Sequence, residues 1–539
     1  MKKIFYIFIG LIILTTVSCS DYLDINQDPN NPQGNQLKPQ NLLAAALVNP
    51  FRTQAITLND YGNVMSNSWA GNVNAFTGGY RNEFTMDFTT STRSAIWDNL
   101  YIGMGNLNNV AIYPNPSGEY DNFVGVAKIM RSYYMQFIVD LYGDAPYSEA
   151  WKRNENLTPK YDDDKSIYLD LFKQLEDGRT LLSSASSVAI DEQDVVFHGD
   201  LNKWIDFANT VELKMWLRLS NLSSAQLGTE LAALKSIRLA ALSSSTFVSA
   251  DVTINPGYTN ATLAQNNPFY SVWGPAANGS TAGTNRNFSV ASDYMAKVLM
   301  GTQNNTHVNS IGVLDPRRAR IFRTATGQPA NTIRGVVQGD VAANAGGGAP
   351  ATLSLIGVGV TGYTGSGAAD AHLNGSSKDG YIMLLSESLF LQSEASQVFT
   401  QFSGFDGKTL FEDGIRASFA YHSKDLTTIA LTDIVATTYL TQINTKLGLG
   451  WNATPNKIEA IMTQKWIALC GIHGIEPFLD LVRTGYPNVP LAIIANHTSK
   501  PRRLLYPTSE YTANSANVPN VALDQLFSVN SSSPFWVTQ

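Results

Sequence analysis

Residues 127–150 read AKIMRSYYMQFIVDLYGDAPYSEA, and the hydrophobic pattern of this stretch changes sharply near its end. Up to residue 141 the apolar side chains recur at spacings of three and four. This spacing places one set on a single helix face, namely Met130, Tyr134, Phe137, Ile138 and Leu141. Gly143 and Pro146 follow and favour a tight turn. The stretch therefore predicts an amphipathic helix over 127–139 that ends in a turn.

Three further segments have the same helical period, at residues 204–219, 381–399 and 458–470. Another helix is expected to begin near Glu476-Pro477, because proline is tolerated in the first turn, and to stop at Gly485. Several of these segments have similar lengths, which is compatible with a degenerate array of helix pairs. The sequence therefore predicts a mostly α-helical protein.

Two long stretches between the helical segments are polar and irregular, at residues 250–287 and 336–379. Loops of this length inside a compact protein are commonly functional. No clear boundary splits the chain into independent units. We therefore expect residues 41–539 to form a single domain with loop-rich insertions at about 250–380.

The N-terminus is typical of a targeting segment rather than of folded structure. Two lysines precede an apolar run at residues 4–14 that is too short to span a bilayer core of ~30 Å. Ser18 directly before Cys19 is typical of a bacterial lipobox, although Thr16 stands where leucine is commonest. We expect residues 1–19 to be a lipoprotein signal peptide with Cys19 as the lipidated residue. The alternative is an ordinary secretory signal with an incidental cysteine.

The composition excludes some classes of partner. Charged residues make up 15% of the chain, against roughly 25% in ordinary globular proteins, and the net charge is −7. Nucleic-acid binding is dominated by Lys and Arg that neutralise phosphates, so no nucleic acid is expected. Asn, Ser, Thr, Gly and Tyr supply the polar groups instead, and they suit sugar hydroxyls or peptide amides.

Metal and cofactor motifs are not found in the sequence. The six histidines are scattered without ligand spacing. Residues 20–40 are rich in Asp, Asn, Pro and Gly, and we interpret them as a flexible tether. The acidic run lacks the residue spacing of an EF-hand, so it does not predict a calcium site. No nucleophile elbow or phosphate-binding loop occurs, so no catalytic residue, metal or cofactor is expected.

Two further features have structural interpretations beside the chemical ones. Cys470 shares an apolar stripe with Trp466 and Leu469, which favours a buried structural thiol over a catalytic nucleophile. Asp162-Asp163-Asp164 precedes an apolar helical pattern. Acids at a helix start favour capping over a paired-carboxylate glycosidase site.

Aromatic residues in polar contexts are the remaining signal for a ligand site. Flat rings flanked by amides suit a neutral sugar, whose C–H face stacks on a ring, and they also suit a peptide. The alternative for each ring is anchoring of a loop onto the body. The candidates are Trp69, Asn72, Asn74, Phe76, Tyr80 and Arg81 in one segment and Tyr270 and Trp273 in another.

Motifs along the whole mature chain resemble the SusD/RagB nutrient-binding lipoproteins, most closely the SusD-like branch associated with starch binding. The first is residues 140–150, quoted above. Others follow in the same order, at residues 159–162, 199–204 with 207–209, 315–317, 464–469, 483–487 and 502–507. Each motif alone is weak, but together they are specific.

The resemblance implies a helical body with tetratricopeptide-like helix pairs and an irregular, loop-rich part that carries the ligand site. It also implies a cell-surface protein of the outer membrane that passes a glycan to a TonB-dependent barrel of the SusC type. A RagB-like peptide binder, a surface glycan hydrolase and a purely structural partner of the barrel are the alternatives. Ligand residues vary in this family, so the aromatic candidates rest on composition and context alone.

Overall fold

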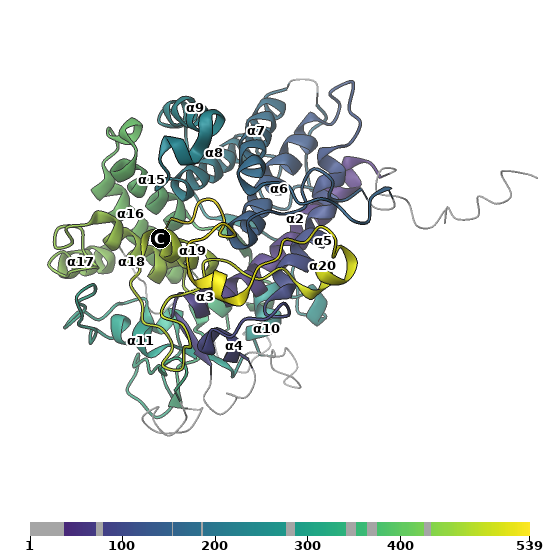
Figure 1. Cartoon of the computed structure of the whole chain (residues 1–539). Coiled ribbons are helices and arrows are strands. Elements are labelled where there is room, and N and C mark those ends of the chain that lie inside the picture. The colour runs from purple at the N-terminus through teal and green to yellow at the C-terminus, as the bar shows by residue number, and fades with distance from the viewer. Residues whose placement is uncertain are drawn as a thin grey trace, which may run out of the picture.

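The computed structural model describes residues 37–71, 79–152, 155–184, 187–275, 286–340, 352–363, 375–424 and 433–538. Most of these residues are helical and the strands are short, which confirms the predicted fold class. Figure 1 shows long helices in the upper and left parts of the view and short elements joined by loops in the lower part.

The first half of the helical body is a chain of neighbouring helices. Consecutive members pack against each other, in the order α2·α5, α5·α6, α6·α7, α7·α8 and α8·α9. Their bounds are α2 (Pro39–Thr53), α5 (Ser94–Ala111), α6 (Asp121–Tyr142), α7 (Asp164–Leu182), α8 (Leu201–Arg218) and α9 (Ser224–Leu242). The central helix, α6, extends the predicted 127–139 segment at both ends and is buried along nearly its whole length.

The second half of the body has the same pairwise packing, with α15·α16, α16·α17 and α18·α19 in contact. The bounds are α15 (Leu385–Val398), α16 (Gly407–Ser423), α17 (Asp433–Ile443), α18 (Lys457–Leu469), α19 (Ile475–Thr484) and α20 (Thr508–Ala513). The predicted helix over 381–399 begins late, because residues 380–383 form a strand. The predicted stop at Gly485 is confirmed: this residue adopts φ +77°, a left-handed cap.

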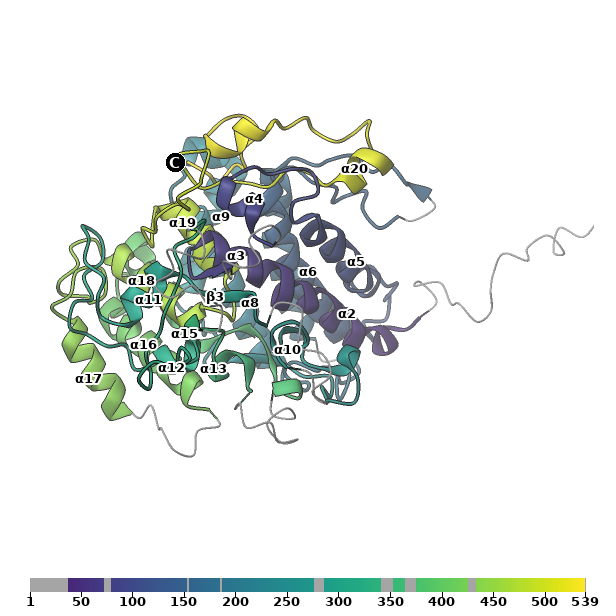
Figure 2. The ribbon, with the colours of Figure 1, turned by 90° about the horizontal axis from the view of Figure 1, so that it is seen from below.

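Short elements make up the loop-rich part, which Figure 2 shows from below around α10, α12 and α13. Strand β1 pairs antiparallel with β3, and β2 pairs antiparallel with β4. The bounds are η2 (Gln54–Leu58), α3 (Asn59–Met65), β1 (Trp69–Gly71), α4 (Arg81–Thr85), β2 (Val252–Ile254), η5 (Leu263–Gln265), α10 (Pro268–Trp273), β3 (Ser289–Ala291), α11 (Asp293–Leu299), α12 (Arg318–Ile321), α13 (Val358–Thr361) and β4 (Gly380–Met383). Two further short helices, η8 (Thr400–Phe402) and η9 (Leu523–Phe527), pack against the core of the helical body.

The motifs that carry the family resemblance stabilise turns. Gly143 ends α6 with φ +77°, and the next turn is held by Asp162, whose carboxylate accepts the N–H groups of Tyr147 and Ser148 at 2.9 and 2.7 Å. Asp163 caps α7 through the Ser166 N–H at 2.9 Å, which confirms the structural interpretation of the acidic run.

A second turn, before α8, is organised by one buried carboxylate. Asp194 accepts the N–H groups of Val196, Phe197 and Gly199 and the indole N–H of Trp204, all at 2.8–3.0 Å. Gly199 has φ +83°, and a Cβ there would lie 2.3 Å from a backbone oxygen, so only glycine fits.

Backbones meet closely where the loop-rich part joins the body. A Cβ on Gly62 of α3 would lie 2.3 Å from the backbone of Gly474, which precedes α19. The Asn59 side-chain amide donates to the Gly471 backbone carbonyl at 2.8 Å, and the Asn63 side-chain oxygen Oδ1 accepts the Gly471 N–H at 2.9 Å. Two buried asparagines therefore bind the turn between α18 and α19 to α3.

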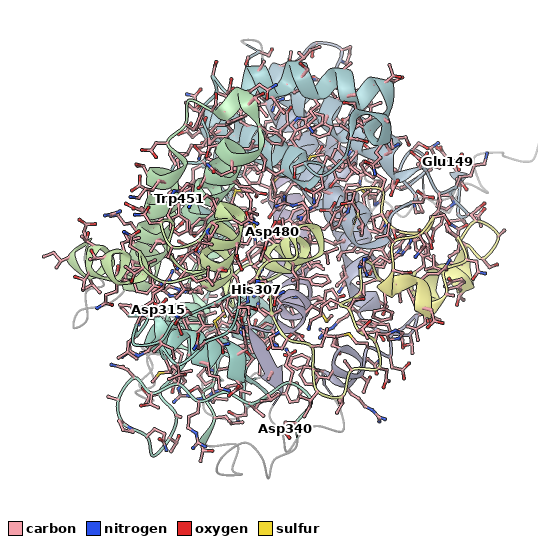
Figure 3. All side chains as sticks on the ribbon, turned by 60° about the vertical axis from the view of Figure 1, so that its left-hand side comes forward. Glu149, His307, Asp315, Asp340, Trp451 and Asp480 are labelled. Atoms are coloured by element: carbon pink, nitrogen blue, oxygen red, sulfur yellow. The ribbon has the colours of Figure 1, made fainter. Side chains whose placement is uncertain are left out.

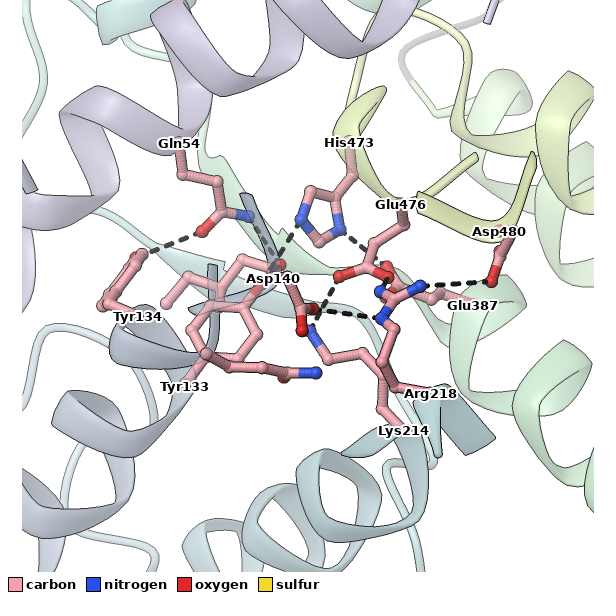
Figure 4. A network of polar contacts seen from close by, with 12 residues as sticks. Gln54, Tyr133, Tyr134, Asp140, Lys214, Arg218, Glu387, His473, Glu476 and Asp480 are labelled. Atoms are coloured by element: carbon pink, nitrogen blue, oxygen red, sulfur yellow. Dashed lines mark hydrogen bonds and ion pairs between the residues drawn. The ribbon is translucent and has the colours of Figure 1, made fainter. Parts of the chain in front are cut away.

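A buried network of charges lies inside the body (Figure 4). Arg218 donates to Asp140 and to Glu476, both at 3.0 Å, and Lys214 lies 2.7 Å from Glu476. Although burial opposes its charged form, these two cations lower the pKa of Glu476. The whole network consists of Asp140, Lys214, Arg218, Glu387, Glu394, Lys465, His473, Glu476, Asp480 and Arg483.

The network joins helices that are distant in the sequence. Its members come from α6, α8, α15, α18 and α19 and from the turn before α19, and none has a side chain more than 4% exposed. Figure 3 shows Asp480 near the centre of the molecule, whereas Asp315 and Asp340 lie in the loop-rich part. Charge pairing thus connects the two halves of the helical body.

Candidate functional site

The candidate site is built on an aromatic floor where β1 meets β3, defined here as Trp69, Phe269, Trp273 and Tyr80. Trp69 begins β1, and its ring lies 5.5 Å from that of Trp273 at the end of α10. Phe269, one helical turn earlier on α10, stacks on Trp273 at 4.6 Å. The spacing of four on a short helix puts both α10 rings on the face that contacts β1.

Polar contacts hold the floor in place. Ser289 of β3 lies 2.7 Å from the Tyr80 hydroxyl and accepts the Trp273 indole N–H at 3.0 Å. The Tyr80 hydroxyl also donates to Asp60 at 2.5 Å, and burial together with the Asp60 charge raises its pKa well above the usual value. Arg93 neutralises Asp60 at 2.6 Å. The floor is thereby connected to α3.

The structure brings Trp69, Tyr80 and Trp273 together, as one site requires, but it buries them. Their exposed fractions are 0%, 2% and 2%, and Tyr270 on the same short helix is also 2% exposed. A buried ring offers no free face to a sugar, so the burial favours the alternative that these rings anchor loops. A ligand role for them stays a prediction.

The other candidates divide into two groups. Arg81 begins α4 and is exposed beside the floor, so its guanidinium is available to a ligand. Asn72, Asn74, Phe76 and the predicted lipidation residue Cys19 lie outside the described residues.

Three half-buried residues beside the floor did not feature in the sequence-based prediction. The Phe288 ring lies 4.9 Å from that of Tyr80 and contacts Gly71 and Gly79. Arg286 lies over the Tyr363 ring, with its Cζ 5.4 Å from the ring centroid. The signal was present for Phe288, because Asn285-Arg286-Asn287-Phe288 has the same amide-rich context as the Trp69 segment.

The surface of the described residues is hollowed in both regions of the molecule. A hollow of about 290 Å³ lies between α11 and the segment 333–340, lined by Asp293, Lys297 and Arg334 among others. A larger groove of about 650 Å³ lies between α15, α16 and α17 in the body. The first is part of the loop-rich region that carries the floor, and the second is not.

Three acidic groups gather at the start of α7. Carboxylate oxygens of Asp144, Asp163 and Asp164 lie within 4.8 Å of one another, the spacing that a metal ion would need. However, Asp144 accepts the Asp164 N–H and Asp164 accepts the Phe535 N–H, at 3.0 and 2.7 Å. Because Asp163 caps α7, all three carboxylates already accept hydrogen bonds from backbone N–H groups. The absence of a bound metal stays a prediction.

Cys470 is buried, as expected for a structural thiol. Burial raises its pKa to about 12, which opposes formation of the thiolate that a nucleophile needs. Within the described part of the chain, no helix combines the length and the hydropathy needed to cross a bilayer.

The fold and the site define a class: a helical scaffold whose loop-rich face surrounds an aromatic floor. The sequence matches the SusD-like family, described as "Starch-binding associating with outer membrane", over residues 29–507. The chain therefore belongs to the SusD-like family, which confirms the resemblance. A comparison with curated proteins returned no match.

Solved structures of SusD homologues have the same fold. A chitin-binding SusD homologue from Flavobacterium johnsoniae is 21% identical, covers 88% of this chain and 94% of its own, and superposes with a TM-score of 0.65. A Bacteroidetes SusD-like protein is 19% identical, with coverages of 93% and 100% and a TM-score of 0.68. A SusD homologue from Parabacteroides distasonis is 20% identical, covers 89% of this chain and 93% of its own, and superposes with a TM-score of 0.67.

Proposed function

We propose that this chain is a non-catalytic lipoprotein of the cell surface that binds a glycan and delivers it to a TonB-dependent barrel of the SusC type. The observation that carries the proposal is the family match, which extends over nearly the whole chain. The chitin-binding homologue with the same fold supports a carbohydrate as the ligand class. Attachment to the outer membrane through Cys19 is part of the proposal.

The loop-rich face around the floor would bind the ligand. Phe288 is the best-placed platform, because its ring is half-buried and rests on Tyr80. Arg81 would add hydrogen bonds at the start of α4. In this proposal the buried rings of Trp69 and Trp273 hold the platform rather than touch the sugar.

Binding is tested by calorimetric titration of the chain from Ser20 onward against chito-oligosaccharides, malto-oligosaccharides and mixed peptides. A saturable glycan signal without hydrolysis is the expected result. A peptide signal would favour the RagB-like alternative, and released reducing ends would establish a hydrolase. Silence across the panel would contradict the proposal and favour a purely structural partner of the barrel.

The platform is tested by Phe288→Ala, which should weaken glycan binding by about 1–3 kcal/mol, the scale of one aromatic contact. Phe405→Ala is the matched control, since Phe405 is also half-buried but packs on Phe402 in the body. If Phe288→Ala, Trp69→Ala and Trp273→Ala all bind like the wild type while folded, the floor is not the ligand site.

The barrel partner is tested separately. A tagged chain expressed in its host and purified from detergent-solubilised outer membranes should bring a TonB-dependent barrel with it. Cys19→Ala should release the chain from the membrane fraction. A chain that stays membrane-bound after this substitution would contradict lipidation at Cys19.

A further inference from the structure

The loop-rich part has a charge balance opposite to that of the whole chain. Between residues 252 and 377 there are seven Lys and Arg against four Asp and Glu, whereas the chain as a whole has 37 against 44. Basic residues are thus concentrated in the part of the protein that carries the aromatic floor.

Two of the four acids in this part are paired with cations of the same part. Asp293 lies 2.7 Å from Lys297, and Asp315 lies 2.7 Å from Arg317. These pairs leave Arg286 and Arg323 without a carboxylate at ion-pair distance among the residues that the structure describes. The two arginines therefore carry positive charges on this face that no described carboxylate neutralises at ion-pair distance.

Arg286 and Arg323 lie close together beside the floor. Arg286 precedes β3 by three residues, and Arg323 bonds the backbone of Leu355, which in turn pairs with Val290 of β3. Burial and the nearby Arg323 charge lower the pKa of Arg286. Two like charges that affect each other without an acid between them are destabilising, and a bound anion would relieve their repulsion.

The Tyr363 ring fixes how Arg286 can bind. The Arg286 guanidinium lies over the Tyr363 ring and also hydrogen-bonds the Tyr363 side chain. A guanidinium has five N–H donors, so other donors can bind a second partner. Arginine edges match the geometry of carboxylate and of sulfate-like oxygens. Arg323 is exposed, so its guanidinium is accessible to a ligand.

We propose that Arg286 and Arg323 form an anion subsite at the edge of the aromatic floor, so that the glycan bound here carries negative groups. Uronate carboxylates and sulfate esters share this chemistry. The inference rests on the proposed function and makes it more specific, because the site would prefer an acidic glycan to a neutral one.

The test compares three oligosaccharides of equal length by calorimetry: an oligogalacturonate, a sulfated galactan fragment and a neutral galactan fragment. Variants are Arg286→Gln, Arg323→Gln and the double substitution, with Lys203→Gln on the exposed start of α8 as the control. Circular dichroism confirms that each variant is folded.

At least one acidic probe should bind more tightly than the neutral one, and its affinity should fall as salt rises. Each arginine substitution should weaken it about tenfold or more, because a hydrogen bond to a charged group is lost, while Lys203→Gln has no effect. Which acidic probe binds distinguishes uronate from sulfate.

Three results would overturn the inference. Equal or tighter binding of the neutral probe would do so and leave the proposed function intact. So would an acidic peptide that binds in place of both acidic glycans, or a double variant with unchanged affinity. Silence toward glycans of every kind would overturn the proposed function as well.

Discussion

The helical body and the loop-rich part differ in how many charged side chains they bury and in how completely these are paired. The body buries ten charged or ionisable side chains and pairs them with one another, and Figure 4 shows part of this group. The loop-rich part buries uncharged rings beside isolated ion pairs such as Asp315–Arg317, and among the described residues Arg286 and Arg323 have no carboxylate at ion-pair distance. Charges that are paired inside serve the scaffold, whereas charges left unpaired outside remain available to a ligand.

The largest effect is expected from Arg218→Met in the body. The substitution leaves Asp140 and Glu476 without their shared cation in a buried site, which should lower the free energy of unfolding by about 3–5 kcal/mol. Denaturant unfolding measures the change. Arg416→Met is the control, because Arg416 is partly exposed and its pair with Asp433 should contribute at most about 1 kcal/mol. Equal losses in both variants would contradict the importance of the network.

A pH effect is expected at the start of α7. Burial raises the pKa of Asp164 from 3.8 to about 7, and the Asp144 and Asp163 charges add to this, although the Phe535 N–H opposes it. The folded protein therefore holds a proton that the unfolded chain releases, so stability should fall as pH rises from about 4 to 7.

Asp164→Asn should remove this loss, because its amide oxygen can still accept the Phe535 N–H. At pH 7 the variant should exceed the wild type by about 2–4 kcal/mol in unfolding free energy, and at pH 3 the two should be alike. Melting curves across this range decide the matter. Asp433→Asn, 80% exposed, should show no such pattern.

The smallest effect is expected in the loop-rich part, from Tyr80→Phe. This change removes the hydroxyl that donates to Asp60 and should cost about 1.5–3 kcal/mol, because the acceptor is charged. Tyr113→Phe is the control, since the Tyr113 hydroxyl has no hydrogen bond among the described residues. If Tyr80→Phe is as damaging as Arg218→Met, the contrast between the two regions is wrong.

Helix positions and turns followed from local chemistry. The period of three and four in residues 127–141 predicted the core of α6, and Gly485 predicted the end of α19, because both signals act within a few residues. The start of α15 was placed too early, since Ile382 fits a helical stripe but lies in β4, the strand that pairs with β2. A pairing partner more than a hundred residues away leaves no local signal.

For the site, residue type and sequence context predicted which aromatic residues lie close together, but they did not predict how exposed those residues are. Trp69, Tyr80 and Trp273 were grouped from amide-rich surroundings, and they do meet. The burial of Trp69 could not be predicted, because it depends on Phe269 and Trp273, which belong to a segment distant in the sequence. Phe288, which had the same context, is the ring left half-buried.

Local patterns in the chain were thus enough to predict a mostly helical protein, because helix periodicity, caps and turn glycines act over short distances, and the ordered motifs added the resemblance to the SusD-like family. Only the tertiary structure decided which charges are neutralised and which rings are covered. Ion pairs such as Arg218 with Asp140 join positions 78 residues apart. Whether a carboxylate lies near Arg286 depends likewise on the packing of distant segments, and the spacing of residues in the sequence does not predict it.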